Sequence, residues 1–192
     1  MMNSKSPRID RRRAEARKRI IAVAIQKFAE KGVDEVNLDE IAEEADLARG
    51  TFYSHFQGKE SLIYEILHPL LEDVAARISE LEKYPPGEAI DALLRLYLEL
   101  WREYQNGLRM VYQIKQHELG KLEPVHGRFL QNIIQVFQKL ADSGLLRYPD
   151  PKLAALVTYR LAIPLMELLD GTPEFERLFM ESMKGLLLLE TK

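Results

Sequence analysis

Apolar residues recur at spacings of three and four along almost the whole 192-residue chain. This spacing follows the period of an α-helix, so each segment presents one apolar face and one polar face. Glycine and proline separate these segments, and both residues commonly end helices. The sequence therefore predicts an all-α fold of about nine helices.

Two of the predicted helices are short and adjacent. A first helix ends at Gly32, and the next begins at about Leu38, where Asn37 and Glu40 have the spacing of a capping box. Asp46 then interrupts the pattern, because aspartate tolerates the left-handed conformation of a tight turn. Two short helices joined by a turn of about three to four residues form a helix-turn-helix unit.

The stretch "DLARGTFYSHF", residues 46–56, begins the second helix of this unit and has two distinct faces. At about 100° per residue, Ala48, Phe52 and Phe56 lie on the inner side. The small residues Gly50 and Ser54 lie on the opposite crest. A helix with a small crest can approach another surface closely, and the DNA major groove, about 12 Å wide, admits a helix.

Residues beside this crest carry side chains suited to nucleic-acid contact. Arg49 is suited to guanine O6 and N7, and the methyl group of Thr51 to a thymine methyl. Tyr53, His55 and Lys59 are expected to hold phosphates. The alternative is that Tyr53 and His55 are ordinary half-buried residues. If either residue is considered alone, this alternative is favoured.

The N-terminal segment is strongly basic, although the whole chain has a formal net charge of −3. Residues 1–19 contain eight Lys or Arg and two Asp or Glu, whereas residues 65–192 contain 15 Lys or Arg and 19 Asp or Glu. A basic arm on a mildly acidic body is typical of contact with a polyanion. A solvated basic tail has the same composition, so both interpretations stay open on charge alone.

Residues 17–62, "RKRIIAVAIQKFAEKGVDEVNLDEIAEEADLARGTFYSHFQGKESL", closely resemble the DNA-binding domain of TetR-type (TetR/AcrR) transcriptional regulators. The family pattern has a first helix ending in Phe and Gly, an "IA" helix, a turn and "G(T/N)xYxHFxxKExL". The chain meets this pattern at Phe28, Gly32, Ile41, Ala42, Gly50, Thr51, Tyr53, His55, Phe56, Lys59, Glu60 and Leu62.

The resemblance implies a homodimer that binds double-stranded operator DNA, usually as a repressor, and that a small-molecule effector releases. It carries phosphate or base contact onto Arg49, Gly50, Thr51, Tyr53, His55 and Lys59. It also implies three parts: a basic N-terminal arm over residues 1–13, a DNA-binding domain over 14–62, and a ligand-binding and dimerisation domain over 63–192. An activator of the same fold is an alternative.

Two positions depart from the family pattern. Asp46 stands where the family usually has glycine in the turn, and Ala48 stands where it usually has a Ser or Thr cap. Loss of such a cap costs roughly 1 kcal/mol. We expect the fold to survive and the DNA affinity to depend more on the basic arm.

After Gly58 a long helix with a broad apolar face is expected to continue to about Leu81. Pro69 lies inside it and removes a backbone hydrogen bond to Glu65, which favours a kink. By the resemblance, this helix links the DNA-binding head to the body. The kink either absorbs a ligand-driven tilt or is a static bend.

Five further helices are expected, over residues 86–105, 108–119, 124–143, 151–169 and 173–190. The last two contain "LAALVTYRLAIPLMELL" and "FERLFMESMKGLLLLE", which are too apolar for a solvated helix pair. In the family, the corresponding helices form the four-helix interface of the dimer, and the resemblance implies the same use here.

The resemblance also implies a ligand pocket in the body. Residues of the types that dominate small-molecule sites are Tyr97, Trp101, Tyr104, Met110, Tyr112, Phe129, Ile133 and Phe137. The same residue types also fill cores, so both interpretations remain open. Few charged residues are expected among them, which favours a hydrophobic or aromatic effector.

The sequence gives little support for disulfide-bonded, thiolate-metal or membrane proteins. The chain has no cysteine, which excludes disulfides, thiolate metal sites and a cysteine nucleophile. No apolar run approaches the roughly 20 residues of a membrane helix, and no apolar signal core follows the basic N-terminus, so a cytoplasmic protein without membrane contact is expected.

Enzyme motifs are also missing. The sequence contains no glycine-rich phosphate loop, HExxH or nucleophile elbow, so we expect neither catalysis nor a cofactor. His117, Glu118, Glu123 and His126 have no recognised metal-ligand spacing, and no metal is expected. A helical protein-interaction module would keep Phe52 and Phe56 but would not need the basic arm.

Overall fold

The computed structural model describes residues 7–114 and 120–189 of the chain. These residues form eight α-helices: α1 Pro7–Lys31, α2 Leu38–Glu44, α3 Arg49–His55, α4 Lys59–Ser79, α5 Pro86–Gln113, α6 Glu123–Asp142, α7 Pro151–Leu169 and α8 Phe175–Leu187. The predicted all-α fold is confirmed. None of these helices combines the length and hydrophobicity that spanning a bilayer requires.

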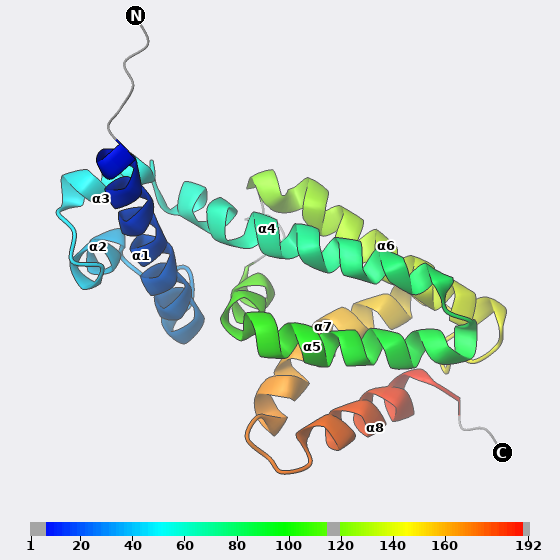
Figure 1. Ribbon diagram of the computed structural model, residues 1–192. Helices are drawn as coiled ribbons and strands as arrows, with labels where there is room; N and C mark the ends of the chain where they lie inside the picture. Colours follow the sequence, from blue (N-terminus) through cyan, green and yellow to red (C-terminus); the bar gives the residue numbers. More distant parts are fainter. Residues whose placement is uncertain (1–6, 115–119, 190–192) are drawn as a thin grey trace, which may run out of the picture.

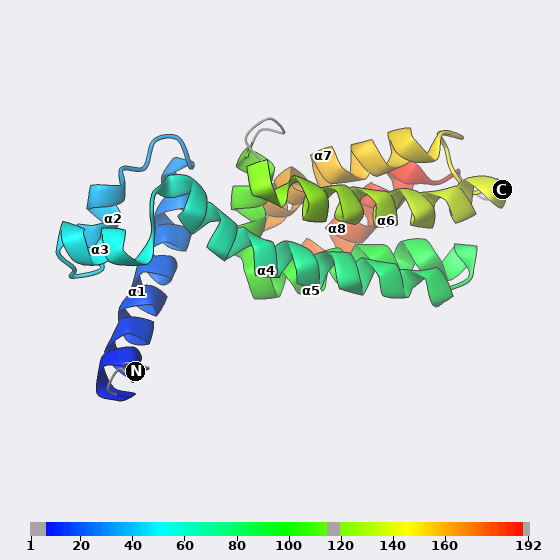
Figure 2. The same cartoon turned by 90° about the horizontal axis from the view of Figure 1, so that it is seen from above.

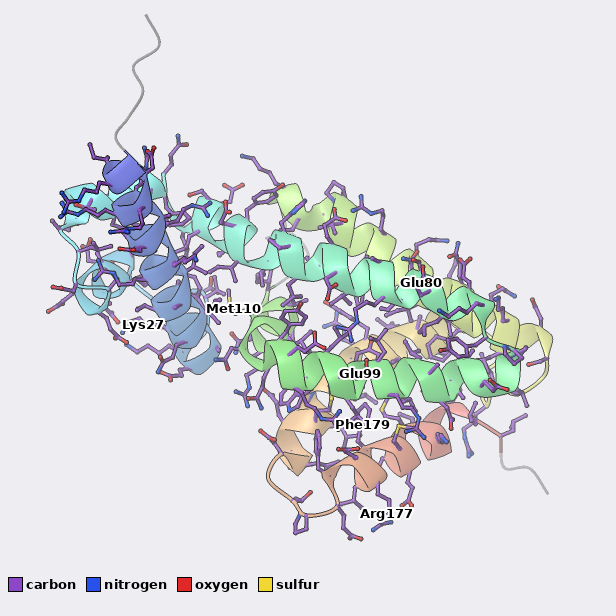
Figure 3. All side chains as sticks on the ribbon, viewed as in Figure 1. Lys27, Glu80, Glu99, Met110, Arg177 and Phe179 are labelled. Carbon is purple, nitrogen blue, oxygen red and sulfur yellow. The ribbon has the colours of Figure 1, made fainter. Side chains whose placement is uncertain are left out.

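Helices α1, α2 and α3 form a small head at one end of the molecule (Figure 1). Phe28 of α1, Ile41 of α2 and Phe52 of α3 are 0% exposed and belong to its core. An ion pair between Lys27 Nζ and Glu44, at 2.6 Å, ties α1 to α2. Figure 3 labels Lys27 on the side of α1 that faces α2. One long and two short helices therefore share one apolar core.

Helix α4 leaves the head and runs along the body (Figures 1 and 2). Near its start, Glu65 forms an ion pair with Arg17 of α1 at 2.5 Å. Further along, Val74 and Ile78 are buried among the helices of the body. Pro69 lies inside α4, which continues through it to Ser79. Helix α4 thus contacts both parts of the molecule, and α5 of the body also contacts α1 of the head.

Helix α5 lies in the middle of the body and contacts α4, α6, α7 and α8. Helix α6 packs between α4 and α7, and α8 packs on α7 and α5. Phe179 of α8 is 0% exposed and lies between α8 and α5 (Figure 3). The amphipathic faces predicted from the sequence therefore bury one another in a helical body.

Residues 86–113 form one kinked helix, whereas the sequence predicts a break between 105 and 108. The kink is at Tyr104, whose φ of −131° and ψ of 27° are not helical. Shortly after it, a Cβ on Gly107 would overlap the side chain of Leu70 in α4. Glycine therefore permits the close approach of α4 and α5. The described residues accordingly hold eight helices rather than nine, and the predicted ends at 119 and 190 lie outside them.

Within the described residues, the basic arm predicted over residues 1–13 is continuous with the head. Residues 7–13 form the first turns of α1, and residues 1–6 lie outside the described residues. The exposed arginines of this segment therefore stand on a helix.

Candidate nucleic-acid interface and interior cavity

The turn between α2 and α3 depends on Asp46. Its φ is 54°, which is the one positive φ of a non-glycine residue in the described part of the chain. The N–H groups of Asp46 and Leu47 donate to the carbonyls of Glu43 and Ala42, each at 3.0 Å. This pairing is a Schellman motif, which closes the C-terminus of α2. The predicted left-handed conformation of Asp46 is confirmed.

Helix α3 begins without a side-chain cap, as predicted. Ala48 occupies the N-cap position with φ −63° and ψ 144°, and makes no side-chain hydrogen bond. It is exposed rather than part of the inner stripe, because it precedes the helix and the helical rotation does not apply to it. Phe52 and Phe56 are buried as predicted, at 0% and 3% exposure.

The outward face of α3 makes few contacts within the chain. Its exposed residues are Arg49, Gly50, Thr51, Tyr53 and Ser54, and 46% of Tyr53 is accessible. A Cβ added to Gly50 would meet no atom within 4 Å, and Gly50 does not have a positive φ. Neither turn geometry nor internal packing therefore requires glycine at this position.

Arg49 is held by α2. Its Nη2 lies 2.7 Å from Oδ2 of Asp39, while 71% of the Arg49 side chain is exposed. The other carboxylate oxygen of Asp39 is buried and has no hydrogen-bond partner among the described residues. Because the guanidinium carries five N–H donors, the ion pair orients it and leaves donors for another partner.

His55 ends α3 and is half-buried. Burial, with smaller contributions from Arg13 and Arg17, lowers the pKa of His55, so its imidazole is neutral at neutral pH. Arg13 Nη2 donates to the carbonyl of Ser54 at 3.2 Å. The Arg17 guanidinium lies 5.4 Å from the centre of the Phe56 ring. These contacts hold the basic half of α1 beside α3.

Lys59 has an internal role that the sequence did not indicate. Its Nζ donates to the carbonyls of Val33 at 2.8 Å and Asp34 at 3.2 Å. These bonds hold the loop between α1 and α2 against the start of α4. An ammonium group has three donors, so one N–H remains for a phosphate.

The basic half of α1 adds positive charge next to α3. Its exposed basic residues are Arg8, Arg11, Arg12, Arg13, Lys18 and Arg19. Sequence reasoning identified the charge but missed the individual contacts of Arg13 and Arg17 with α3. The dense run of arginines was the sequence signal for these contacts. The helical register that brings Arg13 and Arg17 to α3 was not predicted.

A cavity of about 30 Å³ lies between α4, α5, α6 and α7. Three of the eight predicted ligand residues line it, namely Tyr97, Tyr112 and Phe129. Its volume corresponds to about one water molecule, whereas small-molecule sites typically measure roughly 300–1,000 Å³. A ligand larger than water therefore requires the surrounding side chains or helices to move apart.

The other five predicted ligand residues lie elsewhere. Trp101 is buried, and the Arg109 guanidinium lies 5.3 Å from its ring centre. The Tyr104 hydroxyl donates to Asp73 Oδ2 at 3.2 Å, beside the kink in α5. Three fully buried core residues are Met110, Ile133 and Phe137. The residue types of a pocket and a core are the same, which explains why the sequence did not separate them.

Tyr97 and Tyr159 bring polar groups to the cavity. The Tyr97 hydroxyl is buried without a hydrogen-bond partner in the described residues, and burial raises its pKa. The Tyr159 hydroxyl lies 3.2 Å from Nε2 of His126, whose pKa burial lowers. Sequence reasoning missed Tyr159 and the contact of His126, because both depend on the packing of α6 against α7.

Helix α7 carries apolar side chains that face solvent in the single chain. They are Leu153, Leu156, Leu161 and Leu168, with exposures between 42% and 78%. Their helical spacing places them on one broad side of α7. Several exposed leucines on one face are typical of a surface that another protein covers.

Of the four possible metal ligands, only Glu123 and His126 lie within the described residues. His117 and Glu118 lie outside the described residues, and His126 is adjacent to Tyr159. Within residues 7–114 and 120–189, no three His, Asp or Glu side chains converge as metal ligands would.

Comparisons with known proteins bear on both parts of the molecule. Residues 20–66 match the model of bacterial regulatory proteins of the tetR family. Over 177 residues, the chain is 26% identical to the uncharacterized HTH-type transcriptional regulator YhgD of Bacillus subtilis, covering 89% of this chain and 92% of YhgD. Over 137 residues, it is 42% identical to the HTH-type transcriptional regulator SrpR of Pseudomonas putida, covering 68% of this chain and 63% of SrpR.

A solved structure shares the whole fold. AibR, solved in complex with isovaleryl coenzyme A and operator DNA, superimposes with a TM-score of 0.73 and 17% identity. The match covers 90% of this chain and 98% of the AibR chain. The arrangement of a three-helix head on a helical body is therefore common to both.

Proposed function

The chain is a helix-turn-helix regulatory protein of the TetR family, and we propose that it is a ligand-responsive repressor that binds a palindromic operator as a homodimer. The observation that carries this proposal is the exposed face of α3, with Gly50 at its crest and the basic half of α1 beside it. A helix of this shape and charge environment suits the major groove.

The proposed DNA contacts follow from the surroundings of each side chain. Arg49, oriented by Asp39, reads guanine, while Gly50 lets the backbone approach the base edges. The residues proposed for phosphate contact are Thr51, Tyr53, His55 and Lys59. His55 acts there as a neutral donor, and Lys59 acts through the N–H that its two carbonyl bonds leave available.

The second copy of the chain is proposed to cover the leucine-bearing side of α7, with α8 beside it. These leucines are exposed in the single chain, and burying them removes apolar surface from water. A two-fold dimer would set the two α3 helices roughly 34–36 Å apart, one turn of DNA. The symmetry of the dimer would then match a palindromic operator.

Coupling between ligand and DNA is proposed to run through α4. Val74 and Ile78 of α4 line the cavity, and Glu65 near the start of α4 pairs with Arg17 of the head. A ligand that parts the cavity walls moves α4 and hence the head. Such coupling is typically about 1–3 kcal/mol. AibR, solved with both a ligand and operator DNA, supports the combination of the two activities.

Pro69 remains the proposed position at which α4 absorbs this movement. It lies between the contacts with the head and the cavity-lining residues of α4. Structures with and without effector should differ in the direction of α4 before and after Pro69. An unchanged bend there would leave the proline as a static feature.

Selection of binding sites from random duplex DNA by the full chain tests the central proposal. The enriched sites should be inverted repeats, and log affinity should fall steeply with log salt concentration because phosphate binding releases counterions. Arg49→Ala should lower the preference for the enriched sequence. Gly127→Ala, on the exposed side of α6 and outside the proposed DNA contacts, is the matched variant and should bind as the unchanged chain does.

The outcome separates this proposal from its alternatives. Failure to enrich any duplex, or an affinity that does not change with salt, would exclude DNA binding and favour a protein-interaction module. Transcription in vitro from a promoter that overlaps the selected site should fall when the chain is added. A rise in transcript would identify an activator instead.

A further inference from the structure

The residues that line the interior cavity are apolar except for three tyrosines. Tyr97 and Tyr112 belong to α5 and Tyr159 to α7, and the other lining residues are Val, Ile, Leu and Phe. No charged side chain is among the described residues that line this cavity. The cavity therefore offers hydrogen bonds but no charge to a bound molecule.

The Tyr97 hydroxyl is the polar group without a partner. It is buried and makes no hydrogen bond within the described residues, although a tyrosine hydroxyl can both donate and accept. Buried polar groups are nearly always paired. Burial raises the pKa of Tyr97, so its proton stays in place at neutral pH and is available for donation.

Two ionisable side chains, His126 and Arg160, adjoin Tyr159 but do not line the cavity. His126 contacts the Tyr159 hydroxyl at 3.2 Å and, because burial lowers its pKa, is neutral at neutral pH. Arg160 is exposed, with its guanidinium 5.8 Å from the centre of the Tyr159 ring. Neither residue lines the cavity, so a buried carboxylate or ammonium group would lack a counter-ion there.

We propose that the effector is an uncharged, mainly apolar molecule with one hydroxyl or carbonyl oxygen, which the buried Tyr97 hydroxyl binds and the Tyr159 hydroxyl supports. This inference rests on the proposed ligand-responsive function and specifies the chemistry of its ligand. A phenol, an alcohol or a ketone fits this class. Carboxylates and amines do not, because their charge would be buried without a partner.

The size of the cavity adds a second condition. At about 30 Å³, the cavity accommodates about one water molecule. A ligand must therefore enlarge the cavity by separating its walls. Apolar contacts with the leucine and valine side chains would offset the free-energy cost of this movement. A bridging water on Tyr97 is the competing occupant.

Three matched probes test the proposal with the full chain: 4-propylphenol, propylbenzene and 4-propylbenzoate. They share the apolar part and differ in having one neutral oxygen, no oxygen or a negative charge. By isothermal titration, 4-propylphenol should bind on the order of tenfold more tightly than either of the other two. Equal or tighter binding of 4-propylbenzoate, or no binding of 4-propylphenol up to about 1 mM, would overturn the proposal.

Tyr97→Phe identifies the group that selects the oxygen. Because the hydroxyl has no hydrogen-bond partner among the described residues, its removal should leave the fold intact. The preference for 4-propylphenol over propylbenzene should fall to less than about threefold, while propylbenzene binding stays unchanged. Tyr148→Phe is the matched control, since Tyr148 does not line the cavity. An unchanged preference in Tyr97→Phe would overturn the role of Tyr97.

Operator binding, measured on the same samples, separates this inference from the proposed function. If 4-propylphenol binds through Tyr97 but operator affinity stays the same, the ligand class stands and ligand-responsive regulation fails. If the chain binds its operator and no probe binds, DNA binding stands and the ligand class fails.

Discussion

Arg49 is exposed at the start of α3, yet its guanidinium does not rotate without constraint. Asp39 holds it at 2.7 Å from the preceding helix. The ion pair reduces the side-chain entropy that Arg49 would lose on meeting a base. It also places a negative charge near the proposed path of the DNA backbone, which weakens phosphate binding in general. Asp39 therefore lowers the overall affinity for DNA while it orients the Arg49 side chain.

Asp39→Asn tests whether Asp39 has these two effects. Without the ion pair, preference for the selected operator over a scrambled duplex should fall roughly threefold, the order expected of an exposed pair, while affinity for the scrambled duplex rises. Glu43→Gln removes the same charge from α2, where Glu43 is exposed, and should leave the preference unchanged. Fluorescence anisotropy with both duplexes measures the ratio. Equal ratios in the two variants would contradict the orienting role.

Gly50 provides a second test at the level of one residue. Gly50→Ala should preserve or raise stability, by up to about 1 kcal/mol, because alanine is the better helix former and the added methyl group meets no atom. Operator affinity should nevertheless fall roughly tenfold, since the methyl group would hold α3 away from the base edges. Thermal unfolding and operator titration give the two values. Unchanged affinity would contradict close contact at Gly50.

The short elements of the head differ in how their ends are closed. Helix α2 has a side-chain cap, since the N–H of Asp39 donates to Asn37 Oδ1 at 3.0 Å, and a Schellman motif at Asp46. Helix α3 has no side-chain cap at Ala48. Its position therefore depends on the burial of Phe52 and Phe56 rather than on its own hydrogen bonds.

Substitutions at the two N-caps should have opposite effects on stability. Ala48→Ser supplies the missing oxygen and should raise the free energy of unfolding by about 1 kcal/mol, whereas Asn37→Ala should lower it by a similar amount. Urea unfolding followed by circular dichroism measures both changes. A lower midpoint for Ala48→Ser would show that the extended backbone at residue 48 does not direct a serine oxygen to the first turn.

At this scale the sequence predicted much of the fold, because helix periods and Gly or Pro boundaries are local signals. Asn37 and Asp46 were recognised from local backbone chemistry. The break predicted after Gln105 became a kink at Tyr104, because packing against α4 extends across it. Lys59 and Tyr159 show that local signals do not predict contacts between distant parts of the chain. Their partners, Val33 and His126, come from other elements, so only the folded chain brings them together.

The whole molecule combines a basic head, a small cavity in the body and an apolar side on α7. Helices α4 and α5 both line the cavity and contact the head, whereas the leucines of α7 lie on the outside of the body. A dimer formed through α7 would fix the bodies together while each head remains attached through its own α4 and through the contact of α1 with α5. The spacing of the two heads then depends on both copies, which is why operator binding and dimerisation are expected to be linked.

Leu156→Glu tests that linkage. Leu156 is 50% exposed on α7, so a glutamate there should leave the chain folded but place a charge in the proposed interface, where its desolvation opposes association. Sedimentation equilibrium should show a shift from dimer to monomer. Affinity for the palindromic operator should fall by at least roughly tenfold, because the second half-site is no longer bound at high effective concentration.

A single half-site supplies the internal control for this variant, since each head binds it alone. Leu156→Glu should match the unchanged chain on that duplex. Gln131→Glu adds the same charge on the exposed side of α6 and should change neither the mass nor the operator affinity. If Leu156→Glu is monomeric and still binds the palindrome as tightly as the unchanged chain does, the heads act independently. Dimerisation through α7 would then not set the half-site spacing.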